Sequence, residues 1–371
     1  MRMSSPAARL WLLAAAATLA SCTGGPPTLP PATAADARAL IDASLPRGLS
    51  DRSGWRNDIY AAFTVLTVQP THENVCAVVA VIQQESGFQV DPVIPGLGAI
   101  ARREIDNRAA RAHLPLLIVH GVLGWKSSDG RTYGERIDRA RTEKDLSDIY
   151  EDFIAGVPLG RTLFDDRNPI RTRGPMQVNV AFAEQFAAAA AYPYPVTRSI
   201  PDEVFTRRGS IYFGIAHLLD YRAPYHDYVF RFADYNAGQY ASRNAAFQNA
   251  VSVASGIALD DDGALLPRAK DANTPGATEL AVRTLGPRMA LSDAAIRAGL
   301  EQAKLNSFEQ SSLYLRVFEL ADKAAGAPLP RALLPAIKLQ GPKIKRQLTT
   351  EWYARRVEQR FKGCLKLPEP A

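Results

Sequence analysis

The apolar positions of this chain recur mostly at three- and four-residue spacings, which is typical of amphipathic helices. One such pattern begins near Ser53, a suitable N-cap, and places Trp55, Ile59, Phe63 and Leu66 on one side. Further helical patterns cover residues 142–153, 179–186, 209–221, 226–237, 292–306, 313–325 and 348–361, and residues 114–125 are apolar enough for a buried helix. Strand signals are almost absent, so the pattern predicts a mainly α protein.

One of the predicted helices ends in a carboxylate. Val75–Ile82 contains no charged residue and leads directly to Glu85. The β-branched content of this run would also suit a buried strand, but Gly87 stands where helices commonly stop. We therefore expect Glu85 in the last turn of a buried helix. The helix C-terminus and the apolar surroundings would both raise the pKa of its carboxyl, which suits a general acid near neutral pH.

The first residues have the features of an export signal. Two arginines precede the apolar stretch Leu10–Leu19, which is too short for a convincing transmembrane helix. The stretch ends at Leu19–Cys22, which resembles the bacterial lipobox, whose cysteine is lipidated. We expect residues 1–21 to be a signal peptide, Cys22 to carry lipid and the Pro-rich residues 22–35 to form a tether. The residue after the cysteine is not aspartate, which by the same resemblance implies the periplasmic face of the outer membrane in a Gram-negative bacterium.

The net charge bears on the class of partner, and the cysteines bear on a disulfide. The formal net charge is +6, and removal of Arg2 and Arg9 leaves 6 − 2 = +4, a small and dispersed excess that does not favour nucleic acid as a partner. Cys76 and Cys364 remain once Cys22 is lipidated. In an oxidising compartment they are candidates for a disulfide, which would pack the C-terminal residues onto the Glu85 helix; two buried free thiols are the alternative.

No metal or cofactor is predicted. Three adjacent carboxylates, Asp260–Asp262, precede Gly263 and invite a calcium interpretation. They lack the alternating ligand spacing and the distal glutamate of an EF-hand loop, so we interpret them as a turn.

Three short segments stand in a suggestive order: Gln84–Phe88, Gly174–Val178 and Ala233–Gly238. Together they resemble the lytic transglycosylases of bacterial cell-wall turnover, whose lysozyme-like domain has a Glu-Ser, a Gly-Leu-Met-Gln and an Ala-Tyr-Asn-Ala-Gly motif. The full-length arrangement looks like that of a family of bacterial lipoproteins containing this motif set. The match covers about half of the mature chain.

The resemblance implies a mainly α fold with three parts. A lysozyme-like core would span residues 36–253, with a large helical insertion at about residues 90–173, and a helical C-terminal region over residues 254–371 would pack on the core. The insertion accounts for one departure from the family, which keeps its first two motifs much closer together. Two further departures are Pro175 in place of leucine, which withdraws a backbone N–H, and Asp234 in place of alanine.

By the same resemblance, the chain is a lipid-anchored enzyme that cleaves the β-1,4 bond between N-acetylmuramic acid and N-acetylglucosamine in peptidoglycan strands. Glu85 would be the single catalytic acid and base, with a 1,6-anhydromuramic product and no cofactor. Ser86 would bond near Glu85 or the sugar, Met176 and Gln177 would line the cleft, and Tyr235 and Asn236 would fix Glu85 and the N-acetyl group.

Two other functions remain open at this point. A muramidase-type hydrolase needs a second carboxylate to position water, for which Asp91, Asp106, Asp165 and Asp166 are candidates by their place in the sequence alone. A non-catalytic lipoprotein that binds peptidoglycan is the other.

Four arginines flank the motifs and could meet the carboxylates of peptide stems. They are Arg171, Arg173, Arg207 and Arg208. Solvated arginines are the alternative, since this side chain is usually exposed.

Overall fold

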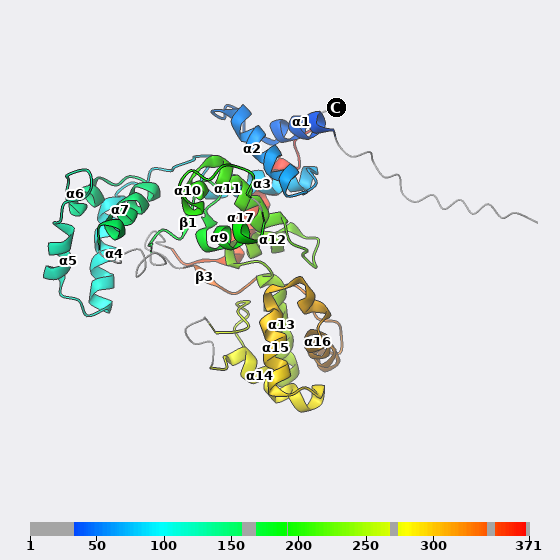
Figure 1. Ribbon diagram of the computed structural model, residues 1–371. Coiled ribbons are helices and arrows are strands. Elements are labelled where there is room, and N and C mark those ends of the chain that lie inside the picture. Colours follow the sequence, from blue (N-terminus) through cyan, green and yellow to red (C-terminus); the bar gives the residue numbers. More distant parts are fainter. Residues whose placement is uncertain (1–32, 158–167, 191, 268–273, 340–345, 369–371) are drawn as a thin grey trace, which may run out of the picture.

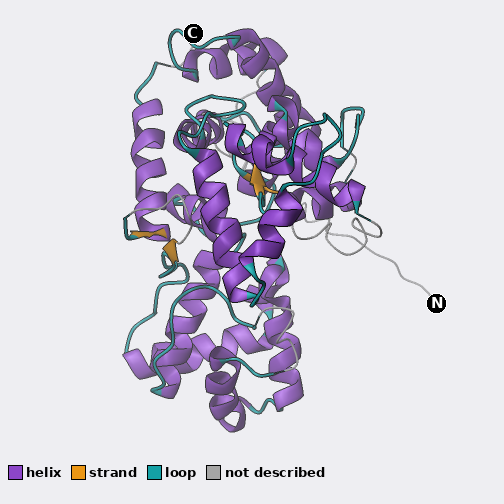
Figure 2. Cartoon of the chain, turned by 90° about the vertical axis from the view of Figure 1, so that its left-hand side faces the viewer, coloured by secondary structure: helices purple, strands orange, loops and turns teal. Residues whose placement is uncertain are grey.

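The computed structural model describes residues 33–157, 168–190, 192–267, 274–339 and 346–368. The described chain is mainly helical, as predicted, and its strands form two short antiparallel pairs (Figure 2). No helix among these residues is long and apolar enough to cross a membrane. The predicted signal peptide, Cys22 and most of the tether lie outside the described residues, as do Asp165 and Asp166.

Figure 1 shows the order and placement of the elements. The α-helices are α1 (Ala34–Ser44), α2 (Arg52–Val65), α3 (His72–Glu85), α4 (Leu97–Arg111), α5 (Leu116–Leu123), α6 (Tyr133–Arg139), α7 (Glu143–Gly156), α9 (Val180–Ala189), α10 (Ile200–Phe205), α11 (Arg207–Leu219), α12 (Tyr228–Ala237), α13 (Ala241–Ser255), α14 (Ala277–Met289), α15 (Asp293–Glu301), α16 (Ser312–Ala325) and α17 (Thr350–Cys364). The 3₁₀ helices are η3 (Gln302–Lys304) and η4 (Asn306–Gln310), and the strands are β1 (Thr172–Arg173), β2 (Val178–Asn179), β3 (Lys338–Leu339) and β4 (Leu348–Thr349).

Helix caps explain where two of the predicted helices begin. The pattern placed the N-cap of α2 at Ser53, but the cap is Asp51, whose carboxylate accepts from the backbone N–H of Gly54 at 3.2 Å. Aspartate is as good an N-cap as serine, so composition alone did not separate the two positions. The helix predicted over residues 142–153 is α7, and it begins with a capping box in which Thr142 and Asp145 each accept a hydrogen bond from the other's backbone N–H.

The main core, defined here as the buried side chains of α2, α3, α11, α12 and α17, forms around α3. Every residue of Val75–Ile82 is buried, because neighbouring helices contact α3 from several sides. α17 lies between α3 and α12, so the last helix of the described chain belongs to the main core.

A second core, made by α13, α14, α15 and α16, lies beside the main core (Figure 1). The chain leaves the main core after α12, builds this second cluster and returns through β3 and β4 to α17. The grouping cuts across the boundary expected at residue 253, because the buried residues of α13 from Ala246 onward pack with α14 and α16. The sequence composition around residue 253 marked the end of a helix, but it did not show which of the two cores that helix, α13, packs into.

The residues between α3 and β1 form a helical unit, as expected for the insertion. α4 to α7 lie to one side of the main core (Figure 1), and Tyr133, Ile137, Ala140 and Ile149 form a small core of their own. The apolar residues 114–125, predicted as a buried helix, contain α5, but none of its residues is buried and Leu117 is 85% exposed. That prediction was wrong, because the main contacts of α5 among the described helices are with α4 and α6, which leave its side chains exposed.

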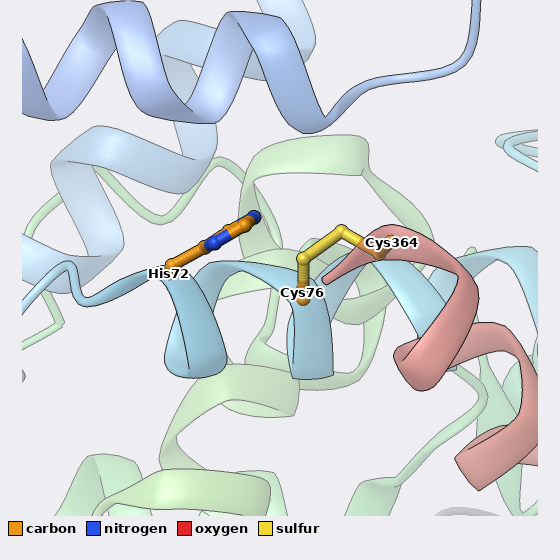
Figure 3. A group of neighbouring side chains, drawn as sticks. All are labelled: His72, Cys76 and Cys364. Carbon is orange, nitrogen blue, oxygen red and sulfur yellow. A yellow bond between two sulfur atoms is a disulfide. The ribbon is translucent and has the colours of Figure 1, made fainter. Parts of the chain in front are cut away.

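A disulfide joins Cys76 in α3 to Cys364 at the end of α17, with the Cα atoms 5.5 Å apart (Figure 3). His72 lies one turn before Cys76, and its ring and the two sulfurs all lie within 4.8 Å of one another. Such a trio resembles a metal-ligand set, but a thiolate is the form of cysteine that binds metals, and both sulfurs here are bonded to each other. In this oxidised form Cys76 and Cys364 are a covalent clamp between the two helices.

We expect replacement of both cysteines by alanine (Cys76→Ala, Cys364→Ala) to lower the free energy of unfolding by about 2–5 kcal/mol. The bond closes a loop with a sequence separation of 288 residues, and its loss frees the unfolded chain. Urea unfolding of a form that starts at Thr23 measures the change. The same protein with both cysteines intact should fall to the same value when a reductant is added. An unchanged midpoint in either case would contradict the stabilising role.

Candidate active site

Glu85 is the last residue of α3, and the chain turns away immediately after it. Gly87 has φ +60°, the left-handed conformation that ends helices, as its position in the sequence predicted. The Glu85 carboxyl accepts a hydrogen bond of 2.5 Å from the hydroxyl of Tyr353. The pKa of Glu85 is raised to about 7. Burial is the main cause, the hydrogen bond from Tyr353 lowers the pKa, and the charge of the Glu143 carboxylate raises it. This carboxyl can therefore both give and accept a proton near neutral pH.

Tyr353 is a site residue that the sequence analysis missed. It stands in α17, is 5% exposed and comes 268 residues after Glu85. A helix was predicted over 348–361, but only the proposed Cys76–Cys364 pair linked that segment to the Glu85 helix. The spacing from Tyr353 to Cys364, three helical turns along α17, was the signal that could have placed this tyrosine at the far end of α3.

The second motif forms a tight turn between β1 and β2. Gly174 and Gln177 have φ +71° and +49°, and the N–H of Met176 donates to the hydroxyl of Ser210 in α11 at 3.0 Å. The side chain of Met176 is fully buried against Gly214, so it packs in the core and does not face an open cleft. The turn is thus fixed by its backbone and by helix α11.

Gln177 connects the turn to the insertion helices. Its side-chain N–H donates to the carboxylate of Glu143 at 3.2 Å, and its carbonyl accepts from the hydroxyl of Thr172 at 2.9 Å. Glu143 is the first residue of α7 and is the carboxylate whose charge acts on Glu85. The motif residue Gln177 and α7 therefore meet beside Glu85.

The third motif binds the second motif and α17. The hydroxyl of Tyr235 donates to the carbonyl of Met176 at 2.6 Å, and the side-chain oxygen of Asn236 accepts from the hydroxyl of Thr350 at 2.8 Å. The hydroxyl of Ser86 donates to the carbonyl of Ile82 at 3.2 Å. Ser86, Tyr235 and Asn236 were expected to bond to Glu85 or to the sugar. In the structure these three side chains bond to other protein groups, and the hydrogen bond to Glu85 comes from Tyr353.

Asp234, which stands in place of the family's alanine just before Tyr235 and Asn236, holds the junction of α12 and α13. Its carboxyl is fully buried, and burial raises its pKa to about 7. Its hydrogen-bond donors are the hydroxyls of Tyr221 and Tyr225 and the backbone N–H groups of Tyr240 and Ser242. A buried carboxyl with this many donors fixes the chain direction after Tyr235.

Two of the candidates for a second carboxylate are among the described residues, and each has a partner within the protein. Asp106 pairs with His120 at 2.9 Å between α4 and α5. Asp91 is hydrogen-bonded to Thr142 at the start of α7. Asp165 and Asp166 lie outside the described residues. Glu143, which no sequence pattern marked, is the acidic residue that acts on Glu85.

Asp260–Asp262 lie in an irregular segment after α13, which agrees with the interpretation as a turn. The carboxylate of Asp262 accepts from the side chain of Gln248 and from the N–H of Ala264, both at 2.9 Å.

Comparison with known proteins assigns the chain to a family. The family model described as "Protein of unknown function (DUF1615)" matches residues 48–367. The chain belongs to the DUF1615 family. The matched range includes the main core, the insertion helices, the second core and α17, so every described helix and strand except α1 falls within one family model.

A relative from Escherichia coli (strain K12), the uncharacterized protein YaiW, is 49% identical over 333 residues and is covered to 90% on both chains. A search of the solved structures gave no significant match.

We expect Gly174→Ala to lower the free energy of unfolding by at least about 3 kcal/mol. A side chain strains the left-handed backbone by about 1–2 kcal/mol, and here the added Cβ would also overlap the carbonyl oxygen of Val204 and lie 2.7 Å from the Ser210 Cβ. Gly256→Ala is the matched control, because Gly256 has φ +73° with no atom within 4 Å of an added Cβ. Equal losses in the two variants would show that Gly174 is needed for its backbone angle alone.

The difference in unfolding free energy between the wild type and Glu85→Gln should fall by up to about 3 kcal/mol as the pH rises from 4.5 to 7. In this window the folded protein keeps the Glu85 proton and the unfolded chain loses it. The stability from the raised pKa is therefore complete below pH 4.5 and lost above pH 7. Chemical unfolding at a series of pH values measures it. A flat difference would mean that Glu85 titrates normally, and subtraction removes the parallel contribution of Asp234.

Proposed function

We propose that this chain is a lipid-anchored peptidoglycan lytic transglycosylase with Glu85 as its single acid and base. The observation that carries the proposal is the Glu85 carboxyl: it ends a buried helix, its pKa is raised to about 7, and one tyrosine hydroxyl is hydrogen-bonded to it. A glycan-cleaving acid must be protonated before the bond breaks and ionised afterwards, which requires a pKa near the working pH.

The arrangement of the three motifs supports a lysozyme-like core. Motif residues that are far apart in sequence contact one another, since Tyr235 bonds to the carbonyl of Met176 and Gln177 bonds to Glu143 beside Glu85. In this proposal the main core carries the catalytic domain, and the insertion helices α4 to α7 and the second core are additions to it.

The proposed reaction uses Glu85 twice. As an acid, Glu85 gives its proton to the oxygen that links N-acetylmuramic acid to N-acetylglucosamine, and the bond from C1 of the muramic residue to that oxygen breaks. As a base, the resulting carboxylate takes the proton of the muramic C6 hydroxyl, whose oxygen forms a new bond to C1. The product is a 1,6-anhydro ring, Glu85 regains its proton, and no water is consumed. An intramolecular second step gains from the proximity of C6 to C1.

Tyr353 has two effects in this scheme. Its hydrogen bond stabilises the ionised carboxylate, which opposes the rise in pKa caused by burial. It also fixes the direction of the carboxyl, since the tyrosine is buried and held by α17. A proton donor that is held in the correct orientation accelerates the chemical step more than a mobile one does.

The proposed location follows from the N-terminal sequence. Residues 1–21 would be removed, Cys22 would carry lipid and residues 22–35 would tether the folded part to the periplasmic face of the outer membrane, next to the peptidoglycan. The partners in this proposal are the glycan strands and the membrane that holds the lipid.

Glu143 favours a second candidate, a muramidase-type hydrolase. Hydrolysis by inversion needs a second carboxylate that activates water across the sugar from the acid. Glu143 is a carboxylate that acts on Glu85 and is bonded to Gln177. In that case Glu143 would be the base and the product would have an ordinary reducing end.

Mass spectrometry of purified peptidoglycan incubated with the form starting at Thr23 tests both candidates. We expect anhydromuropeptides from the wild type, a loss of at least about a hundredfold in Glu85→Gln, and continued formation of anhydro products by Glu143→Gln. Reducing-end products that vanish in Glu143→Gln would establish the hydrolase in its place. Glycan binding without products from any of the three proteins would favour a non-catalytic binding lipoprotein.

A further inference from the structure

The four arginines that flank the motifs divide into two pairs. Arg207 forms ion pairs with Asp51 and Asp58, the latter at 2.6 Å, and Arg208 pairs with Glu203 at 3.0 Å. These two side chains are committed to partners within the protein. Arg171 and Arg173 instead line a cavity.

The cavity lies between α7 and the segment that runs from β1 to α10, and it has a volume of about 670 Å³. Its walls come from α7, from the β1–β2 hairpin, from the first turn of α9 and from the segment that leads into α10. A space of this size accommodates a short peptide or a comparable small molecule.

Arg173 is the distinctive group in this cavity. The residue is 2% exposed, and burial lowers the pKa of its guanidinium. Among the described residues, its contacts are a hydrogen bond of 3.4 Å from Nε to the carbonyl of Ile170 and the ring of Phe205, 4.8 Å from the guanidinium carbon. No carboxylate in the described part of the chain forms an ion pair with it, although the charges of Glu151, Asp202, Glu184 and Asp148 act on its guanidinium. A buried guanidinium normally has a carboxylate or phosphate partner, so this one is suited to an anion from outside.

Acidic groups line the same cavity, and the charges of two of them, Glu151 and Asp202, act on Arg173. Glu151 accepts from the amide of Asn168 at 3.0 Å, and Asp202 accepts from Ser199 at the start of α10. The first turn of α9 adds partial positive charge near Arg173's strand. A lining that holds both cationic and anionic groups matches a ligand that carries both carboxylate and ammonium groups.

The cavity shares two elements with the Glu85 site. Successive side chains of a strand point to opposite faces, and in β1 Thr172 bonds to Gln177 while Arg171 and Arg173 line the cavity. In α7, Glu143 bonds to Gln177 and Glu151 lines the cavity, about 12 Å further along the helix axis. A ligand in the cavity would therefore lie on the far face of the hairpin that carries Gln177.

We propose that this cavity binds a short peptide with free carboxylate and ammonium groups, and that Arg173 binds one of its carboxylates. This inference rests on the proposed function only for the identity of the peptide, which would be the stem attached to the muramic residue of the glycan. Arg173 would be a specificity residue that favours peptide-bearing strands over bare glycan.

The test uses a synthetic stem tripeptide, L-alanyl-D-isoglutamyl-meso-diaminopimelic acid, and its fully amidated form, titrated calorimetrically into the form starting at Thr23. We expect the wild type to bind the free acid, amidation to weaken binding at least about tenfold, and Arg173→Gln to weaken it by a similar factor. Arg207→Gln is the matched control, because Arg207 flanks the same motif region but pairs with Asp51 and Asp58 outside the cavity. Binding by this control should be unchanged.

Two results would overturn the inference: no binding of the tripeptide to the wild type, or equal affinity of a folded Arg173→Gln variant. If Arg173→Gln does not fold, the amidated peptide decides, since equal affinity for both peptides would exclude recognition of a carboxylate. Because the assay contains no glycan, its failure leaves the proposed cleavage reaction standing. Conversely, tripeptide binding without any glycan cleavage would preserve this site and remove the transglycosylase.

Discussion

The hydrogen bond between Tyr353 and Glu85 is the constraint on which the candidate site depends. It joins two helices that are far apart in sequence, and each is fixed independently. α3 is buried along its whole apolar run, while α17 is clamped to α3 by the disulfide at one end and bonded to Asn236 through Thr350 at the other. A buried carboxyl with one strong donor is sensitive to small displacements of that donor. The packing of α17 therefore controls the chemistry of Glu85.

The additional helical units attach to the main core at points that also touch the site. α7 brings Glu143 to Gln177, and the buried carboxyl of Asp234 fixes the point where the chain leaves α12 for the second core. In both places the hydrogen bonds of a polar side chain join the main-core part of the chain to one of the additional helical units. Such shared networks couple the position of each unit to the geometry beside Glu85, because breaking them leaves buried polar groups without partners.

Much of the local structure could be predicted, because periodicity and caps act over a few residues. The ending of α3 at Glu85 and the capping box of α7 are examples. α13 was missed because it is buried on nearly all sides and has no polar face, with even Arg243 enclosed by carbonyls of the second core. α5 shows the converse, since apolar composition does not reveal whether a neighbour exists. Tyr353 and Glu143 were missed because contacts across long sequence separations leave no local pattern.

The position of α17 in the chain also sets the order in which the site is completed. Glu85 and its helix are synthesised early, whereas Tyr353 follows 268 residues later. A ribosome-bound or partly translocated chain that lacks α17 has Glu85 without its hydroxyl donor and α3 without the helix that covers it. Completion of the site is then a late event in folding, because contacts at such separations form slowly and the covalent clamp requires an oxidising environment. If Glu85 cleaves cell-wall glycan, this order keeps the growing chain inactive until its last helix has docked.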